Sequence, residues 1–203
     1  TLLHGALHSE ASIDLHTLHQ KWVDDLGAQH MCTVWKKVLA ATEKVSRNAR
    51  FKLIQFYYLY RAYLSPKRIS NIFPGASSEC LQCREEQATY IHMVWECPTL
   101  SQYWETVIQV INGATDRLFV GNPLLHLLGH HTHSKMHTVT DKYADLALVL
   151  AWQQITMSWK SPSGPNIHKW KAKLDKWLEC EEAAMRREAG RGLRRCQIAQ
   201  MWD

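Results

Sequence analysis

The chain has 203 residues, of which 46% are apolar, and a formal net charge of +5. That apolar fraction excludes an intrinsically disordered chain, and the mild positive charge suits an anionic partner without requiring one. No stretch approaches the roughly 20 apolar residues that a membrane span needs, no signal peptide is visible, and the first residue, Thr1, indicates a fragment or a processed piece.

The N-terminal part predicts two helices. The first is an amphipathic helix that Gly27 ends, with apolar residues at three- and four-residue spacing. Thr33 is typical of the cap of a second helix that runs to Glu43. The residues that form the apolar stripe of the first helix are Leu15, Leu18, Trp22 and Leu26.

A basic helix is predicted next, from Arg47 to Leu64 after Ser46. Ser65-Pro66 then restarts a short helix, because Ser is a favoured cap and Pro fits the first helical position. Pro74-Gly75 closes that segment. The inner stripe of the long helix is expected to hold Phe51, Ile54, Tyr58 and Ala62.

The second half of the chain is also expected to be helical. Helices are predicted from Thr99 to Ile111, where Asn112-Gly113 ends the first, from Asp141 to about Lys160, and from Ile167 to Met185. With almost no strand signal, the fold is predicted to be mainly α, an irregular helical domain with a small zinc knuckle and a helical C-terminal extension. The expected segments are an N-terminal helical segment at 1–45, a basic helix with the zinc-binding region at 46–111, a His-rich connector at 112–140, and a helical region with a basic tail at 141–203.

The strongest motif has the spacing C-x2-C-x8-H-x4-C. A C-x-x-C turn directs two sulfurs to one point, and three thiolates with one imidazole complete a tetrahedral zinc site. Thr89 is a natural cap for a short helix from Tyr90 to Glu96, and Pro98 is expected to end that helix and return the last thiol to the metal. A closed set of four ligands leaves no position for water, so this zinc would be structural. The alternative is buried reduced cysteines beside a core histidine; the predicted ligands are Cys80, Cys83, His92 and Cys97.

Two other groups imitate functional sites. Asp24-Asp25 invites comparison with the paired aspartates that hold magnesium in reverse transcriptases, but its flanks are polar and helical, so a solvated helix face is the expected role. The histidines at 130–137 lie in a predicted loop without evident supporting partners, so they are not taken as a metal site. Cys32, Cys180 and Cys196 are expected to be ordinary thiols.

Basic residues interleaved with aromatic ones suit phosphate contact and base stacking. The first group of basic residues lies beside the zinc knuckle in the sequence and is interspersed with Tyr57, Tyr58 and Tyr60. A second, less favoured group comprises Lys160, Lys169, Lys171, Lys173 and Lys176 with Trp159, Trp170 and Trp177, whose tryptophans can simply pack. For both groups the alternative is a solvated charged face above an aromatic core. The candidate phosphate contacts beside the knuckle are Arg47, Arg50, Lys52, Arg61, Lys67 and Arg68.

Over about residues 20–180 the chain resembles the region that follows the polymerase in LINE-type (non-LTR) retrotransposon reverse transcriptases. The blocks that carry the resemblance follow one another in order along the chain. They are Lys21-Trp22, Asp25-Leu26-Gly27, Asn48 to Phe56, Arg61-Ala62-Tyr63, Ser65 to Ile69, Ile72-Phe73-Pro74, the C-x-x-C pair, Ala88-Thr89, Ile91 to Leu100 with Trp104, and Trp159 to Pro162 with Trp170.

The resemblance implies a large polyprotein with an endonuclease and an RNA-directed DNA polymerase, which nicks target DNA and copies its own RNA from the nick. This chain lacks both active sites, so no enzyme activity of its own is expected. The expected partners are the element RNA or target DNA and the upstream reverse transcriptase domain, in nucleus and cytoplasm, without a membrane. The alternatives are a structural module that docks on the polymerase core and a decayed, non-functional fragment.

Overall fold

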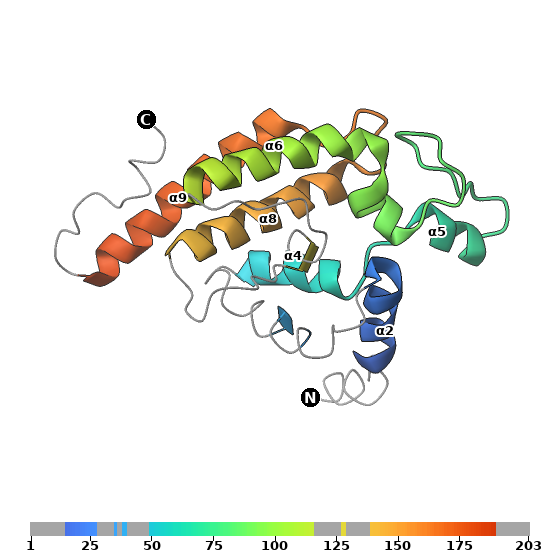
Figure 1. Ribbon diagram of the computed structural model, residues 1–203, viewed down its shortest axis with the longest axis horizontal. Coiled ribbons are helices and arrows are strands. Elements are labelled where there is room, and N and C mark those ends of the chain that lie inside the picture. Colours follow the sequence, from blue (N-terminus) through green and yellow to red (C-terminus); the bar gives the residue numbers. More distant parts are fainter. Residues whose placement is uncertain are drawn as a thin grey trace.

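The structure is a computed structural model that describes residues 15–27, 35, 38–39, 49–115, 127–128 and 139–189 (Figure 1). All regular elements in these ranges are helical, and the mainly α prediction is confirmed. The helices are α2 (Leu15–Leu26), α4 (Ala49–Leu59), α5 (Pro66–Ile72), η1 (His92–Glu96, a π-helix), α6 (Pro98–Thr115), α8 (Val139–Ser158) and α9 (Ile167–Ala189).

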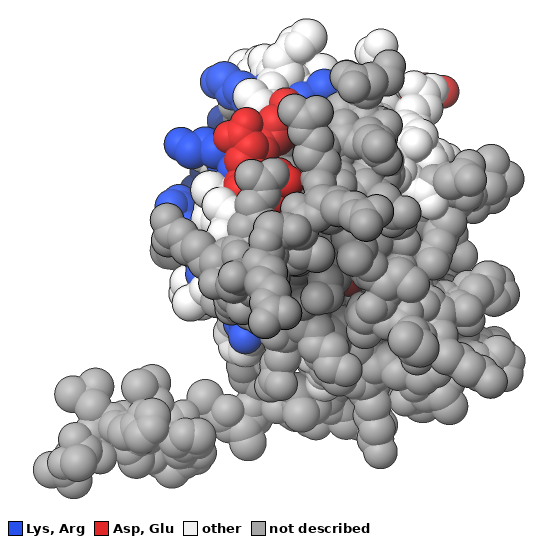
Figure 2. All heavy atoms as spheres, turned by 90° about the vertical axis from the view of Figure 1, so that its left-hand side faces the viewer, with Lys and Arg blue, Asp and Glu red and all other residues white. Residues whose placement is uncertain are grey.

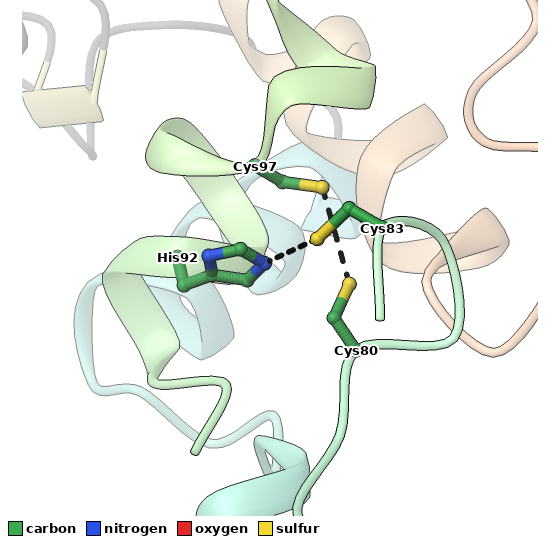
Figure 3. A group of neighbouring side chains, drawn as sticks. All are labelled: Cys80, Cys83, His92 and Cys97. Atoms are coloured by element: carbon green, nitrogen blue, oxygen red, sulfur yellow. Dashed lines mark hydrogen bonds between the residues drawn. The ribbon is translucent and has the colours of Figure 1, made fainter. Parts of the chain in front are cut away.

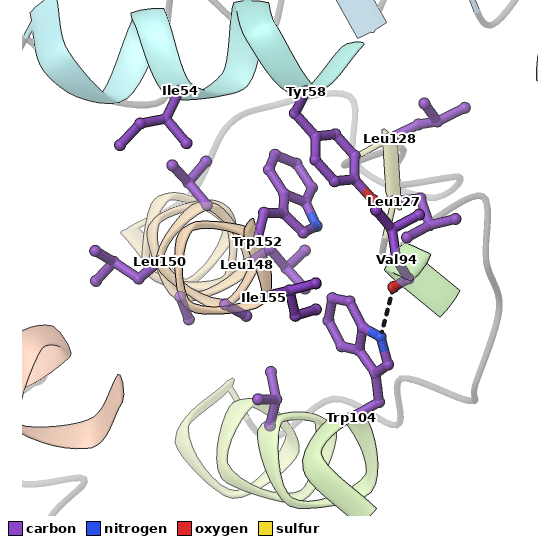
Figure 4. Close-up of a cluster of buried hydrophobic side chains, with 14 of the residues drawn as sticks. Ile54, Tyr58, Val94, Trp104, Leu127, Leu128, Leu148, Leu150, Trp152 and Ile155 are labelled. Atoms are coloured by element: carbon purple, nitrogen blue, oxygen red, sulfur yellow. Dashed lines mark hydrogen bonds between the residues drawn. The ribbon is translucent and has the colours of Figure 1, made fainter. Parts of the chain in front are cut away.

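Helix α8 forms the centre of the molecule. It packs against α4, α6, α9 and η1, and every residue from 143 to 155 is buried. Figure 4 shows α8 end-on between α4 and α6, with Trp152 facing Tyr58. The rings of Trp152 and Tyr58 stack with centroids 4.6 Å apart, and burial of each ring contributes roughly 2–3 kcal/mol. The helix predicted from Asp141 to about Lys160 is confirmed, with observed bounds Val139–Ser158.

The two tryptophans of α9 belong to this core. Trp170 is fully buried and donates its indole N–H to the carbonyl of Ala147 at 3.0 Å. Trp177 is half-buried and meets the ring of Phe51 edge-on, with centroids 4.4 Å apart. Trp170 and Trp177 therefore pack in the core, which was the alternative to a role in base stacking.

Helix α4 ends at Leu59, so the prediction that it extends to Leu64 was wrong. Arg61 adopts a left-handed φ of 52°, and its N–H bonds back to the Tyr58 carbonyl at 3.1 Å. The N–H of Ala62 bonds to the Tyr57 carbonyl at 2.9 Å, and the two bonds together form a Schellman C-cap. Because no glycine marks this stop, the sequence pattern concealed it.

Helix α6 is longer at both ends than predicted. It begins at Pro98, which occupies the first helical position, and it continues through Asn112-Gly113 to Thr115. Ala114 and Thr115 are buried, and the Thr115 hydroxyl donates to the Ile111 carbonyl at 2.7 Å. Burial of the last turn outweighs the helix-ending tendency of Asn-Gly.

Several predicted boundaries are confirmed. Helix α2 ends before Gly27, which has a φ of +63°, and Ser65 caps α5 by accepting from the Arg68 N–H at 3.3 Å. The cap at Thr33 and the helix end at Glu43 lie outside the described residues, although Trp35 and Val38 between them are helical and buried. Within the described ranges, no helix is long and apolar enough to span a membrane.

Candidate metal centre and its surroundings

The four predicted ligands converge in space. Their donor atoms all lie within 4.8 Å of one another, and three of the four residues are buried (Figure 3). The sulfurs of Cys80 and Cys97 are 3.9 Å apart, and the Cys83 sulfur is 3.2 Å from Nε2 of His92. Sulfurs bound to one tetrahedral zinc at 2.3 Å stand roughly 3.8 Å apart. The cluster can hold a metal ion such as zinc.

A short loop at residues 78–88, which we call the ligand loop, holds the C-x-x-C pair. The Cys80 N–H bonds to the Glu85 carbonyl at 2.9 Å, and the Arg84 N–H returns to the Cys80 carbonyl at 2.9 Å. The turn requires a left-handed backbone at Arg84, with a φ of 65°. These bonds close the loop so that both sulfurs face the same point (Figure 3).

The other two ligands sit at the ends of η1. Thr89 accepts the His92 N–H at 3.1 Å through its hydroxyl, which confirms the predicted cap. The Cys97 N–H bonds to the His92 carbonyl at 2.8 Å, and the extended backbone of Cys97 separates η1 from α6. The expectation that the helix stops at Cys97 is confirmed, and its π-helical geometry is an addition that the sequence did not reveal.

Burial and hydrogen bonding act in opposite directions on the thiols. Burial raises the pKa of Cys97 to about 11. Burial also acts to raise the pKa of Cys80, but hydrogen bonds from the backbone of Cys83 and Gln82 outweigh it and lower that pKa. Buried thiolates are disfavoured unless a positive charge compensates them, which a bound cation does.

The cluster is connected to the surrounding helices. The Lys67 N–H at the start of α5 bonds to the Ala88 carbonyl at 3.2 Å, and the Gln82 amide donates to the Ser158 carbonyl at the end of α8 at 3.3 Å. The indole of Trp104 on α6 donates to the Val94 carbonyl of η1 at 3.0 Å (Figure 4). The loop that holds the C-x-x-C pair is thus anchored to α5 and α8, and η1 is anchored to α6.

The candidate phosphate contacts do not form one patch. Lys67 and Arg68 are exposed on α5, Arg50 is exposed on α4 and Lys52 beside it is half-buried, whereas Arg47 lies outside the described residues. Arg61 points inward, with its side chain 13% exposed, and pairs with Asp25. Its guanidinium lies 4.3 Å from the Trp22 ring centroid.

The remaining candidates are distributed as follows. Asp24 is exposed and accepts from Gln20 at 2.8 Å, as expected for a solvated helix face, while Asp25 serves as the partner of Arg61. Cys180 is exposed, and Cys32, Cys196 and the histidines at 130–137 lie outside the described residues. On α9, the lysines at 169–176 are followed by Glu179, Glu181 and Glu182. Figure 2 shows blue and red atoms side by side on the part of this face that the structure describes.

The tyrosines predicted for base stacking differ in exposure. Tyr58 is fully buried, Tyr60 is half-buried and Tyr57 is 41% exposed. Phe56, which was not among the residues predicted to stack on bases, is 42% exposed. The helical register could have revealed this, because the stripe of Phe51, Ile54 and Tyr58 already identified the inner face of α4.

No protein-family model matches this chain. The fold and the site therefore define a class only, namely a mainly α domain with a CCHC cluster that can hold a metal ion.

Proposed function

We propose that this chain is a zinc-stabilised nucleic-acid-binding module from the C-terminal region of a LINE-type reverse transcriptase. Cys80, Cys83, His92 and Cys97 would hold the zinc, whose role is to cross-link the ligand loop to η1. Structural zinc of this kind contributes on the order of 10 kcal/mol to folding. The module would engage element RNA or target DNA for the upstream polymerase, and no catalytic residue is assigned to it.

One observation carries the proposal: exposed cations lie at the start of α5, which is hydrogen-bonded to the loop that holds the C-x-x-C pair. Lys67 and Arg68 are both exposed, and the backbone of Lys67 is hydrogen-bonded to the ligand loop through Ala88. A metal that fixes this loop also fixes the start of α5 and hence both positive charges. Phosphate contacts by such side chains supply most of the affinity in non-specific nucleic-acid binding. The net charge of +5 and the ordered motifs of the LINE-type resemblance support the same function.

The test is a binding titration of a labelled oligonucleotide at several salt concentrations. The double variant Lys67→Glu with Arg68→Glu is expected to weaken binding and to reduce the slope of log affinity against log salt by about 1.4 for a single strand, since each lost phosphate contact removes about 0.7. The comparison is Lys169→Glu with Lys176→Glu on α9, which changes the net charge equally in the second, less favoured group of cations and is expected to weaken binding less. Identical curves for wild type and the α5 variant would contradict the assignment.

A second candidate function is docking on a protein such as the upstream polymerase domain. Ile72 and Phe73 at the end of α5 are 50% and 58% exposed, and neighbouring exposed apolar side chains are typical of protein contacts. A chain that binds no oligonucleotide even at low salt would favour this function over the first.

A further inference from the structure

The outer face of α4 carries exposed aromatic rings. Ile54 and Tyr58 point toward α8 (Figure 4), which leaves the opposite side of α4 outside the core. Phe56 and Tyr57 on that side are 42% and 41% exposed. The ring of Phe56 stacks on that of Tyr60 with centroids 4.1 Å apart and an interplanar angle of 26°. One exposed aromatic residue is ordinary, but a stacked and contiguous set is a common mark of a binding surface.

The rings continue beyond the helix. Tyr57 meets Tyr63 edge-on with centroids 6.3 Å apart, and Tyr63 meets Trp159 at 5.3 Å. The last contact links the turn after α4 to the residue that follows α8. We call this row the aromatic strip; it consists of Phe56, Tyr57, Tyr60, Tyr63 and Trp159.

Cations flank the aromatic strip. Lys52 lies one helical turn before Phe56 on α4, and the exposed Lys160 follows Trp159. Arg68 donates to the Arg61 carbonyl at 3.4 Å, which places its guanidinium at the turn between Tyr60 and Tyr63. The aromatic strip therefore has positive charge near both of its ends and at its middle turn.

We infer that the aromatic strip is a base-stacking platform for single-stranded nucleic acid, an inference that rests on the proposed function and deepens it. Phe56 and Tyr57 are the exposed rings of the strip, and Tyr60, Tyr63 and Trp159 are half-buried beside them. Such rings with neighbouring cations fit the two parts of a single strand, since bases stack on the rings and phosphates approach the cations. A duplex offers its phosphates to the same cations but keeps its base faces inside the helix. The aromatic strip therefore favours a single strand, whose bases are unpaired, over a duplex.

The experiment compares the full chain with Phe56→Ala, Tyr57→Ala and the double variant. Each protein is titrated with a single strand and with the duplex of the same sequence, as RNA and as DNA so that the preferred nucleic acid is identified. The control is Phe73→Ala, which removes an aromatic ring that is 58% exposed outside the aromatic strip. Helix content and bound zinc are measured for every variant, so that loss of folding is recognised.

The double variant is expected to bind the single strand at least about tenfold more weakly, because stacking on one ring is worth roughly 1–3 kcal/mol per base. Its salt slope and its duplex affinity should stay at the wild-type values, since no cation is removed. If the single strand contains 2-aminopurine, the quenching of its fluorescence on binding should decrease in parallel.

Three results would overturn the inference. If the folded double variant binds the single strand with unchanged affinity, the aromatic strip is not a base-stacking platform, while the proposed function stands. An equal loss of affinity for the duplex shows that the rings do not stack on unpaired bases. A wild-type chain that binds neither form, and whose self-association depends on these rings, makes the aromatic strip a protein contact and contradicts the proposed function as well.

Discussion

Gly164 stands where the loop between α8 and α9 meets the start of α6 and the ligand loop. Its φ is +65°, and a Cβ there would lie 3.3 Å from Cγ2 of Thr99 and 3.7 Å from Oε1 of Gln82. An L-residue in this backbone conformation costs about 1–2 kcal/mol before any steric contact is counted. Gly113 differs, because it lies inside α6 with open space around the Cβ position.

These two glycines predict opposite effects of the same substitution. Gly164→Ala should lower the free energy of unfolding by about 1–2 kcal/mol through backbone strain. Gly113→Ala should raise it by about 0.5–1 kcal/mol, since alanine is the better helix former. Urea denaturation of both variants checks this. Equal destabilisation by the two substitutions would contradict the described backbone at both sites.

Single residues also show what the sequence can and cannot predict. The four ligands were predictable because their spacing is local and their donor types suit one metal. Arg61 was grouped with the phosphate contacts because its charge is visible in the sequence and its surroundings are not. Its left-handed backbone turns the side chain toward Trp22 and Asp25, which lie more than 30 positions earlier. Such a pairing depends on tertiary packing.

At the scale of elements, the end of α4 joins α2 to the metal cluster. The indole N–H of Trp22 donates to the Leu59 carbonyl at 2.9 Å, and the Tyr90 hydroxyl donates to the Tyr58 carbonyl at 2.7 Å. Two of the last carbonyls of α4 are therefore satisfied by side chains from α2 and from the residues just before η1. The rings of Trp22 and Tyr90 also touch edge-on, at 5.9 Å.

This arrangement predicts that metal removal loosens α2. Chelation should raise amide hydrogen exchange first in residues 78–97 and then in α2, because Tyr90 precedes the ligand His92 by two residues. In Tyr90→Phe with metal bound, the end of α4 should exchange faster, and so should α2, whose Trp22 is bonded to that end through Leu59, while the ligand loop stays protected; the lost hydrogen bond is worth about 1 kcal/mol. If amide exchange in α2 is unchanged both by chelation and by Tyr90→Phe, α2 packs independently of the cluster.

Element boundaries explain the remaining errors of prediction. The apolar periodicity located the helices, because burial of one face dictates their spacing. It did not locate their ends, since α4 stops at a non-glycine C-cap and α6 continues through Asn-Gly for the sake of two buried residues. The caps at Ser65 and Thr89 were predictable because each acts within three residues of itself.

At the scale of the whole molecule, two centres hold the described fold. One is the apolar core around α8, and the other is the CCHC cluster, from which hydrogen bonds lead to the end of α8 and the start of α5. The packing of α4, α6, α8 and α9 should largely persist without metal, because these helices bury aromatic and aliphatic side chains against one another, although Cys80 and Cys97 belong to the same apolar cluster. The cluster instead fixes the position of α5 and of its two cations, Lys67 and Arg68.

The most direct measurement is the zinc content of the purified, reduced chain by elemental mass spectrometry. Wild type should carry about one zinc per chain, as a closed four-ligand site requires. Cys83→Ser should lose it, and Cys180→Ser, which alters an exposed cysteine outside the cluster, should keep it. A folded wild-type chain without zinc, or equal zinc content in the two variants, would contradict the proposed metal centre.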